Sequence, residues 1–321
     1  MRVANSAGAV IEVHDLVKRY KKAGTNAVDG VSFSVDQGEF FSLLGPNGAG
    51  KTTTISILTT ILEPTGGQAR IGGYDVVSQA KQVRRQIGII FQQPSLDLNL
   101  TAEENVRFHA ILYNLYPFRP TFAAMPRAYQ RHVHQLADVL GLEDDLFKPV
   151  RGFSGGMKRK LEIVRSLIHD PRVLFLDEPT VGLDPLSRRN LWDYLDGVRK
   201  DRNTTVFLTT HYLDETENAD RVCIISKGKV VSMGTPASVK AELASAYLLV
   251  DAAEGEHERL LAELTSKQIP FEDVTPVKIP LRDASIYQIV RAIDTPLAVV
   301  ETHTPTLEDA YLSIIGRGDD Q

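Results

Sequence analysis

A nine-residue stretch, "GPNGAGKTT" from Gly45 to Thr53, constrains the fold of this chain more than any other part of its sequence. It follows the apolar run "FFSLL" and precedes "KTTTISILTTIL", where the apolar spacing changes to that of a helix. A strand, a glycine loop and a helix in this order form a phosphate-binding loop, because glycines let main-chain N–H groups approach phosphate oxygens and the helix N-terminus favours an anion. The stretch therefore predicts an α/β fold that binds a nucleotide.

Two side chains of this loop have separate predicted roles. Lys51 is expected to contact the β and γ phosphates, and the hydroxyl of Thr52 to ligate Mg²⁺. The remaining predicted contacts of the nucleotide in the loop are Gly45, Pro46, Asn47, Gly48, Ala49, Gly50 and Thr53. A loop of this kind alone leaves small kinases, GTPases, helicases and transport motors open.

The rest of the chain predicts one main domain and a smaller one. Strands alternate with helices up to residue 239, which indicates an α/β P-loop fold with a mixed β-sheet core. Residues 101–165 are mainly helical and are interpreted as a subdomain inserted between the halves of the sheet. Residues 240–321 predict a small α+β domain, with strands at 247–252, 272–281 and 297–303 and helices at 256–267, 285–293 and 306–316.

A pair of adjacent acidic residues reduces the number of reactions that a protein with this loop could catalyse. "VLFLDEP" is an apolar strand that ends in two adjacent carboxylates, which the alternation of side chains along a strand directs differently. Asp177 suits the coordination of Mg²⁺, and Glu178 suits activation of a water for attack on the γ-phosphate. A GTPase would normally carry a base-recognition motif such as N-K-x-D, which the sequence lacks.

A second phosphate-binding helix terminus lies about twenty residues earlier. "FSGGMKRKLEIVRSLI" places Ser154, Gly155 and Gly156 at the start of a long helix. One nucleotide already has its glycine loop, so the second terminus suggests a dimer in which the serine-glycine helix of each chain completes the site of the other.

Together these segments resemble the ATP-binding subunit of an ABC (ATP-binding cassette) transporter over about residues 10–236. "GPNGAGKT" looks like the Walker A loop, "FSGGM" like the signature, and "VLFLDEP" like the Walker B strand. Gln92 in "IGIIFQQ" is similar to the Q-loop residue, with adjacent Gln93 as the alternative. Asp184 in "GLDP" resembles the D-loop residue, and His211 in "FLTTHYLDE" the switch histidine.

The resemblance implies an ATPase that closes as a sandwich dimer around ATP and Mg²⁺, with a second copy of the chain or a paralogous ATPase subunit. Tyr20 would stack on adenine, and Gln92 would reach Mg²⁺ and the attacking water. His211 would contact the γ-phosphate and align Glu178 with the water. The helical subdomain would receive integral-membrane permease subunits. Phe153 and Met157 depart from the common L-S-G-G-Q signature, and the methionine is similar to that of drug-resistance exporter ATPases.

Composition bears on partners and location. Residues 240–321 hold 7 basic and 15 acidic residues, so the tail disfavours nucleic acid as a partner. The N-terminus lacks an apolar signal core and no stretch approaches the length of a membrane span, so we expect a cytoplasmic protein, peripheral on the inner face of the membrane through its permease. Cys223, the single cysteine, is expected to be buried on a strand.

The tail bears on the direction of transport. "PTLEDAYLSIIG" resembles the C-terminal element of ABC-2 type exporter ATPases, which implies export of a drug, a lipid or another hydrophobic compound. The alternative is a soluble ABC-type ATPase that acts on nucleic acid or the ribosome without a permease. Relatives of that kind would carry a coiled-coil or zinc insertion, or two cassettes, and neither is evident in the sequence.

Overall fold

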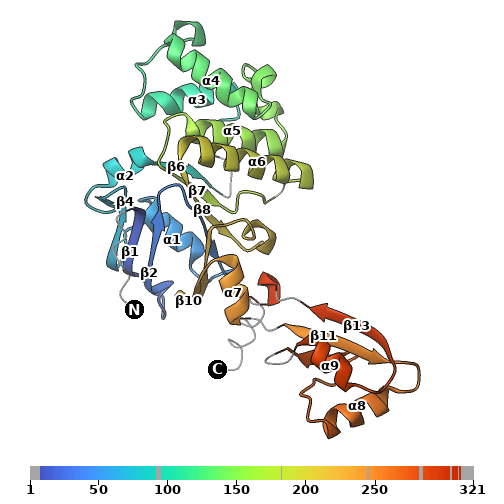
Figure 1. Cartoon of the computed structure of the whole chain (residues 1–321). Helices are drawn as coiled ribbons and strands as arrows, with labels where there is room; N and C mark the ends of the chain where they lie inside the picture. Colours follow the sequence, from blue (N-terminus) through green and yellow to red (C-terminus); the bar gives the residue numbers. More distant parts are fainter. Residues whose placement is uncertain are drawn as a thin grey trace. The chain divides into compact units, whose positions relative to one another are not determined.

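The computed structural model describes residues 8–91, 95–181, 183–243, 246–281, 285–303, 306–309 and 311. Two compact units are present, Met1–Met233 and Gly234–Gln321 (Figure 1).

A six-stranded sheet forms the centre of the first unit. Its strand order is β10-β9-β3-β8-β7-β6, and β3 is parallel to β8 and β9 while β7 is parallel to β6 and β8. Leu44 at the end of β3 pairs with Thr210 of β8, and Asp177 at the end of β7 pairs with Thr209. The carboxyl ends of these strands are therefore level at one edge. The bounds are β3 Phe40–Leu44, β6 Ile87–Ile90, β7 Val173–Asp177, β8 Thr205–Thr210, β9 Arg221–Ser226 and β10 Lys229–Gly234.

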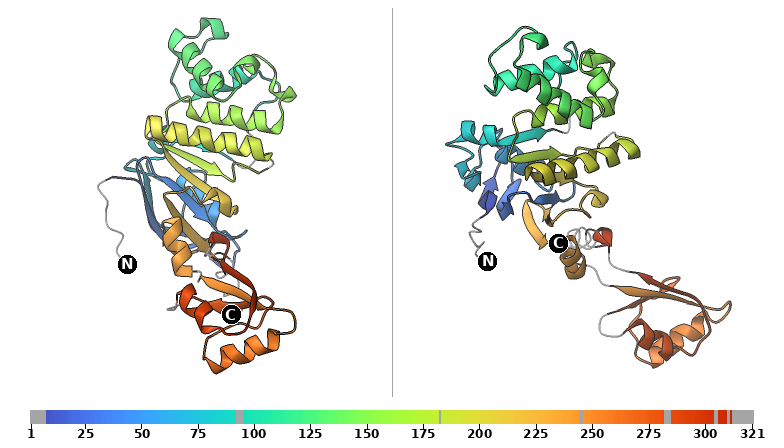
Figure 2. Two further views of the ribbon diagram at one scale, coloured as in Figure 1. Left: turned by 45° about the vertical axis from the view of Figure 1, so that its right-hand side comes forward. Right: turned by 45° about the horizontal axis from the view of Figure 1, so that its top comes forward.

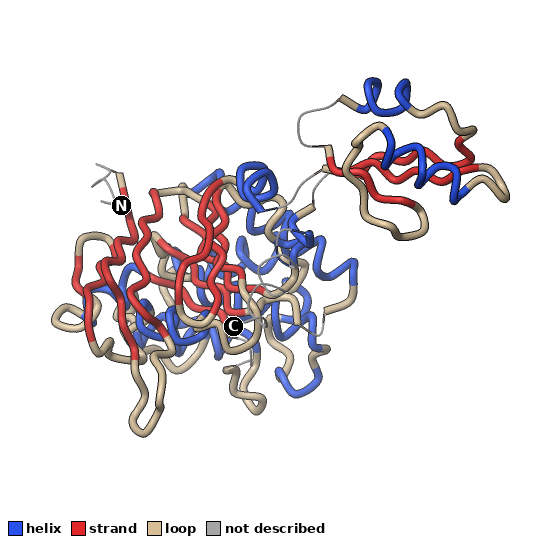
Figure 3. Tube along the Cα trace, turned by 90° about the horizontal axis from the view of Figure 1, so that it is seen from below, coloured by secondary structure: helices blue, strands red, loops and turns tan. Residues whose placement is uncertain are grey.

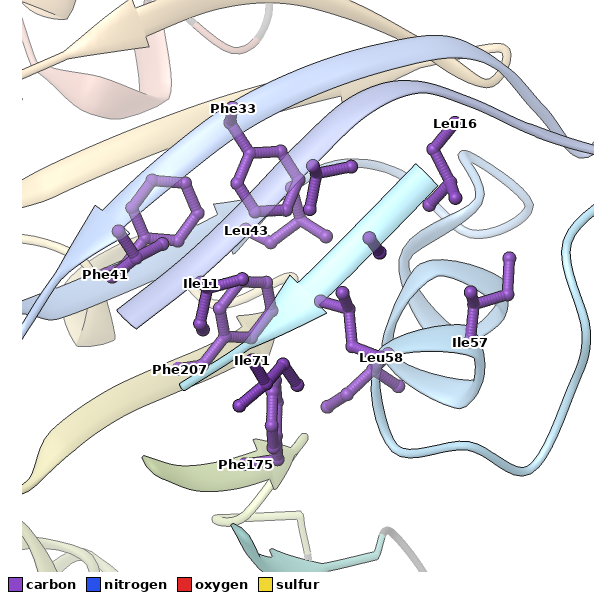
Figure 4. Packing of buried hydrophobic residues seen from close by; sticks show 14 of the residues in the cluster. Ile11, Leu16, Phe33, Phe41, Leu43, Ile57, Leu58, Ile71, Phe175 and Phe207 are labelled. Carbon is purple, nitrogen blue, oxygen red and sulfur yellow. The ribbon is translucent and has the colours of Figure 1, made fainter. Parts of the chain in front are cut away.

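A second, antiparallel sheet packs against the first, in the order β2-β1-β4-β5. Its strands are β1 Ala9–Lys18, β2 Val28–Asp36, β4 Gly66–Ile71 and β5 Tyr74–Asp75. Phe33 of β2 stacks on Phe41 of β3 with ring centroids 5.2 Å apart, and Phe207 of β8 lies 5.3 Å from Phe41 and 5.2 Å from Phe175 of β7 (Figure 4). This run of four aromatic rings joins the two sheets into one core, and buried Cys223 on β9 belongs to the same cluster.

Helix α1, Lys51–Leu58, follows β3 and contacts strands of both sheets, namely β4, β7 and β8. The tube in Figure 3 shows the strands gathered with helices beside them. Helix α2, Ala80–Gln86, leads into β6. The α/β P-loop class expected from the sequence is confirmed, and the mixed character comes from the antiparallel sheet.

The predicted helical subdomain contains α3 Ala102–Leu112, α4 Arg127–Val139 and α5 Gly155–Leu167, which lie together at one end of the unit in both views of Figure 2. Thr101 begins α3 with a capping box to Glu104. Buried Tyr129 of α4 donates its hydroxyl to Glu103 of α3 over 3.0 Å, and Arg107 lies 3.2 Å from the same carboxylate. Short 3-10 turns, η1 Phe122–Ala124, η2 Glu143–Asp145 and η3 Val150–Gly152, connect these helices.

After β7 the chain forms α6, Pro185–Arg202, and after β8 the turn η4, Leu213–Glu215. No helix within the described ranges is long and apolar enough to cross a bilayer.

The second unit has its own core and sheet. Its elements are α7 Pro236–Leu243, β11 Tyr247–Ala252, α8 His257–Ser266, β12 Val277–Pro280, α9 Ile286–Ala292 and β13 Leu297–His303. The sheet is antiparallel in the order β12-β11-β13, and α8 and α9 bury Leu260, Leu264 and Ile289 in the same cluster as Leu248 and Ile279.

Two elements of residues 240–321 differ from their expected bounds or are described only in part. The strand expected over 272–281 is shorter, because Glu272 bridges to Lys278 and the chain turns back between them. Of the helix expected at 306–316, the structure describes helical residues at 307–309 and 311, and the rest lies outside the described residues.

The burial of the aromatic run between the sheets predicts a large loss of stability when one of its rings is removed. Phe207→Ala should lower the free energy of unfolding of the first unit by about 3–5 kcal/mol, because it removes a fully buried ring that contacts three others. Urea unfolding followed by circular dichroism measures this change. The matched control is Phe118→Ala, whose ring is 60% exposed and whose effect should stay within about 0.5 kcal/mol. Equal effects of the two substitutions would contradict the placement of Phe207 in the core that joins the two sheets.

Candidate functional site

The glycine loop between β3 and α1 is shaped by close main-chain approaches. A Cβ on Gly45 would lie 2.4 Å from the carbonyl oxygen of Ile225, and one on Gly50 would lie 2.4 Å from that of Ala27. Gly50 also has φ of 106°, in the left-handed region that favours glycine. Asn47 and Gly48 are exposed at the tip of the loop, while Ala49 is buried and its carbonyl accepts a hydrogen bond from the N–H of Gly228. Both spaced glycines of the motif are thus required by geometry.

Lys51 lies under this loop. It is only 5% exposed, and its Nζ donates to the carbonyls of Gly45 over 2.7 Å and Pro46 over 3.1 Å. Burial lowers the pKa of Lys51, and the negative charges of Glu178 and Asp177 oppose that shift. The ammonium group, the loop and the acidic pair therefore share one small region.

Tyr20, Thr52 and Thr53 lie beside the loop. The hydroxyl of Tyr20 is 3.2 Å from Oγ1 of Thr53 in the first turn of α1, and the Tyr20 ring is partly exposed. Thr52 is exposed at the start of the same helix. The structure thus brings the predicted adenine-stacking residue next to the glycine loop, although Tyr20 and Thr53 are 33 positions apart in the sequence.

The acidic pair follows β7 at the same edge of the sheet. Asp177 is buried and accepts a 2.5 Å hydrogen bond from the hydroxyl of Thr209. Burial raises the pKa of the Asp177 carboxyl; the Thr209 hydrogen bond opposes this and the charge of Glu178 adds to it. A carboxylate oxygen such as that of Asp177 and a hydroxyl oxygen such as that of Thr52 are the kind of donors that suit Mg²⁺.

Glu178 has an uncommon backbone conformation. Its φ is 46°, a left-handed conformation that costs a non-glycine residue about 1–2 kcal/mol. Its N–H donates to the carbonyl of Thr209 over 2.9 Å, and its Oε1 lies 3.1 Å from Nδ1 of His211, just after β8. The turn at Glu178 therefore directs its carboxylate to the histidine instead of continuing the strand.

A buried carboxylate that the sequence reasoning missed joins the loops after β7 and β8. Glu215 accepts hydrogen bonds from the hydroxyls of Thr180 and Thr210, and the Thr210 contact is 2.5 Å. Burial raises the pKa of Glu215, and the two threonine hydrogen bonds oppose the shift. The only sequence signal is an acidic residue four positions after His211, and an exposed turn would carry the same signal.

The serine-glycine segment begins α5. Ser154 is the N-cap, and its Oγ accepts from the N–H of Met157 over 3.2 Å. Ser154 and Gly155 are exposed, and Phe153 is buried as the apolar residue that anchors the turn. Asp184 lies just before α6, where its carbonyl accepts from the N–H of Arg188.

The predicted site residues thus fall into two groups. One group lies at the carboxyl edge of the six-stranded sheet and contains the loop at 45–53, Tyr20, Asp177, Glu178 and His211. Ser154 makes its side-chain hydrogen bond within α5, not with that loop. Gln92 and its alternative Gln93 lie outside the described residues.

Comparison with known proteins fits this arrangement. The family model described as "ABC transporter" matches residues 28–181. The chain is 44% identical to the daunorubicin/doxorubicin resistance ATP-binding protein DrrA of Streptomyces peucetius over 88% of this chain and 83% of that protein. The chain belongs to the ABC transporter family.

The chain is also similar to an export protein and to a solved cassette. The Nod factor export ATP-binding protein I of Ralstonia nicotianae is 37% identical over 71% of this chain and 67% of that protein. A solved dimeric ATP-binding cassette in a post-hydrolysis state, bound to ADP and phosphate, matches with a TM-score of 0.62 at 25% identity over 70% of this chain and 98% of that one. As an ABC transporter ATPase, the chain binds and hydrolyses ATP, as expected from the sequence.

The burial of Glu215 in this ABC ATPase predicts how the free energy of unfolding changes with pH. Because its folded-state pKa is raised above the ordinary value of 4.5, the protonated carboxyl contributes stability that is complete below the unfolded pKa and is lost as pH rises through the folded pKa. Glu215→Gln does not titrate. Its stability relative to the wild type should therefore rise between about pH 4.5 and pH 7.5.

Urea unfolding of both chains at the two pH values measures this difference. Glu63→Gln, at an exposed position, serves as the matched control and should show a smaller pH-dependent difference from the wild type. A Glu215→Gln difference that stays constant with pH would show that the carboxyl does not titrate in this window.

Proposed function

We propose that the chain is the ATP-hydrolysing subunit of an exporter, and that it drives a separate integral-membrane permease. The observation that carries this proposal is 44% identity over most of both chains to an ATP-binding protein named for resistance to two drugs. A second relative is named for export of Nod factor. The cargo would then be a drug, a lipid or another hydrophobic compound, and the protein would lie on the cytoplasmic face of the membrane through its permease.

The first step of the proposed mechanism is capture of ATP. The N–H groups of the loop at 45–50 and the ammonium of Lys51 would hold the phosphates, since they combine a helix N-terminus with a buried positive charge. Tyr20 would stack on adenine. Mg²⁺ would be held by Thr52 and Asp177, with Gln92 as a third ligand, and it would neutralise charge on the phosphate oxygens.

Hydrolysis would depend on the Glu178–His211 pair. Glu178 would accept a proton from the attacking water, and His211 would hold that carboxylate in line through the 3.1 Å contact between Nδ1 and Oε1. Both groups follow level strands, so their separation is fixed by the sheet.

The proposed working form is a sandwich dimer with a second copy or a paralogous subunit. Ser154 and Gly155 are exposed and Gly156 is half-buried at the N-terminus of α5, away from the hydrogen bonds of their own loop at 45–53, which leaves this terminus open to the nucleotide of a partner. Asp184, also exposed, would lie near the same contact. A solved relative with this fold is dimeric, which supports the arrangement.

The helical subdomain is the proposed docking surface for the permease. Exposed apolar side chains gather on α3 and in the segment after it, and Leu112 is 79% exposed. Others in this group are Phe108, Leu115 and Phe118. An apolar surface of this kind on a chain of ordinary polarity indicates a protein contact.

The catalytic part of the proposal predicts the behaviour of Glu178→Gln. ATP hydrolysis should fall by about 10²–10⁴-fold, because the amide cannot accept the proton, while ATP binding remains and the chain elutes as a stable dimer with ATP on size exclusion. Glu63→Gln, an exposed glutamate, is the control and should keep wild-type turnover. Undiminished hydrolysis by Glu178→Gln would remove this residue from the role of base.

The transport part predicts a membrane partner. The tagged full chain should co-purify with an integral-membrane protein from detergent-solubilised membranes, and Leu112→Asp should reduce the recovery of that protein about tenfold or more by placing a charge on the docking surface. Val77→Asp, exposed outside the helical subdomain, should leave the recovery unchanged. Salt-sensitive recovery of nucleic acid or ribosomes without a membrane protein would favour the alternative class and contradict the proposal.

A further inference from the structure

One face of α5 carries two buried charged residues and one half-buried one, and the proposed mechanism uses none of them. Arg159, Glu162 and Arg165 are spaced by three residues, so they lie along the same side of the helix. Arg159 is 6% exposed, Glu162 is fully buried, and the side chain of Arg165 is 13% exposed. Because burial of unpaired charge is costly, the contacts of these residues should explain their presence.

Arg159 binds main-chain carbonyls from two separate motifs. Its Nε donates to the carbonyl of Pro179 over 2.7 Å, and Nη2 donates to that of Glu178 over 3.4 Å. Nη1 donates to the carbonyl of Phe91 over 2.5 Å and to Oε2 of Glu162 over 2.9 Å. The guanidinium therefore connects Phe91, the residue that follows β6, to the turn that carries Glu178.

Glu162 and Arg165 hold the chain on the other side of residues 92–94. Oε1 of Glu162 accepts from the N–H of Ser95 over 3.0 Å. Arg165 donates to the carbonyl and to the hydroxyl oxygen of Ser95, each over 2.6 Å. Phe91 and Ser95, the described residues that flank Gln92, are thus both bound to the same face of α5.

This pattern differs from a buried ion pair that only fills space. An apolar pair of similar volume would pack α5 against the sheet without desolvating charge. The planar guanidinium instead donates in three directions at once, which lysine cannot reproduce. Two of its three carbonyl partners belong to Glu178 and the next residue, at the point where φ is 46°.

We propose that Arg159 is a positioning residue for ATP hydrolysis, which holds the left-handed turn at Glu178 so that its carboxylate faces His211. Glu162 orients the guanidinium, and with Arg165 it keeps the flanks of Gln92 on the helix that begins at Ser154. The inference rests on the proposed role of Glu178 as base. It assigns to α5 a second task, that of connecting the serine-glycine terminus to the catalytic turn.

The test measures steady-state ATP hydrolysis and ATP affinity of the purified full chain with Arg159→Gln. Displacement of Glu178 should lower kcat about ten- to a hundredfold, while KM and the Kd for ATP change by less than about threefold, because the loop at 45–53 is not touched. Arg159→Lys keeps the positive charge but loses the planar guanidinium and its several donors. Its kcat should therefore lie between those of the wild type and Arg159→Gln. Arg131→Gln, an exposed arginine of α4 in the same subdomain, is the matched control.

A double substitution separates positioning from general loss of structure. In the Glu178→Gln background, Arg159→Gln should cause less than about a twofold further loss, since the group that it positions is already gone. A further loss as large as in the wild-type background would overturn the proposal, as would an unchanged kcat in Arg159→Gln. If Arg159→Gln does not fold, the same comparison with Arg159→Lys decides. Wild-type turnover in Glu178→Gln alone would instead show that the proposed base is wrong.

Discussion

The level carboxyl ends of the parallel strands β3, β7 and β8 are the constraint on which the rest of the structure depends. The pairs Leu44–Thr210 and Asp177–Thr209 set the glycine loop, the acidic pair and His211 at one height on one edge of the sheet. A shift of one residue in either pairing would move these groups apart and reverse the faces of the strands. The aromatic run of Phe33, Phe41, Phe207 and Phe175 resists such a shift, since each ring is fully buried between the two sheets.

Around this edge, polar groups are buried and paired instead of solvated. Thr209 binds Asp177, Thr180 and Thr210 bind Glu215, and Arg159 binds the turn at Glu178. In a region of low dielectric such contacts are strong, and an unpaired group is costly, so the loops after β7 and β8 have few alternative arrangements. The position of the Glu178 carboxylate thus follows from a network that reaches the helical subdomain.

The sequence predicted the parts of this site that are encoded locally. Residues adjacent in the chain indicate three of them: the glycine loop, the strand that ends in Asp177 and Glu178, and the cap at Ser154. Glu215 and Arg159 could not be found in this way, because each binds a residue far along the chain, 35 and 68 positions away, and their own surroundings read as a turn and a basic helix. The short antiparallel strands β4 and β5 were also missed, and the strand expected over 272–281 is shorter because the chain turns back between Glu272 and Lys278.

The charged face of α5 also limits how this protein can change over time. Glu162 is fully buried, and loss of Arg159 alone would leave its carboxylate without its closest cationic partner, while loss of Glu162 alone would remove the carboxylate that lies 2.9 Å from the buried guanidinium. Each single step is therefore disfavoured, although replacement of both by apolar residues could be tolerated by the packing. The two positions are therefore expected to change together and not one at a time.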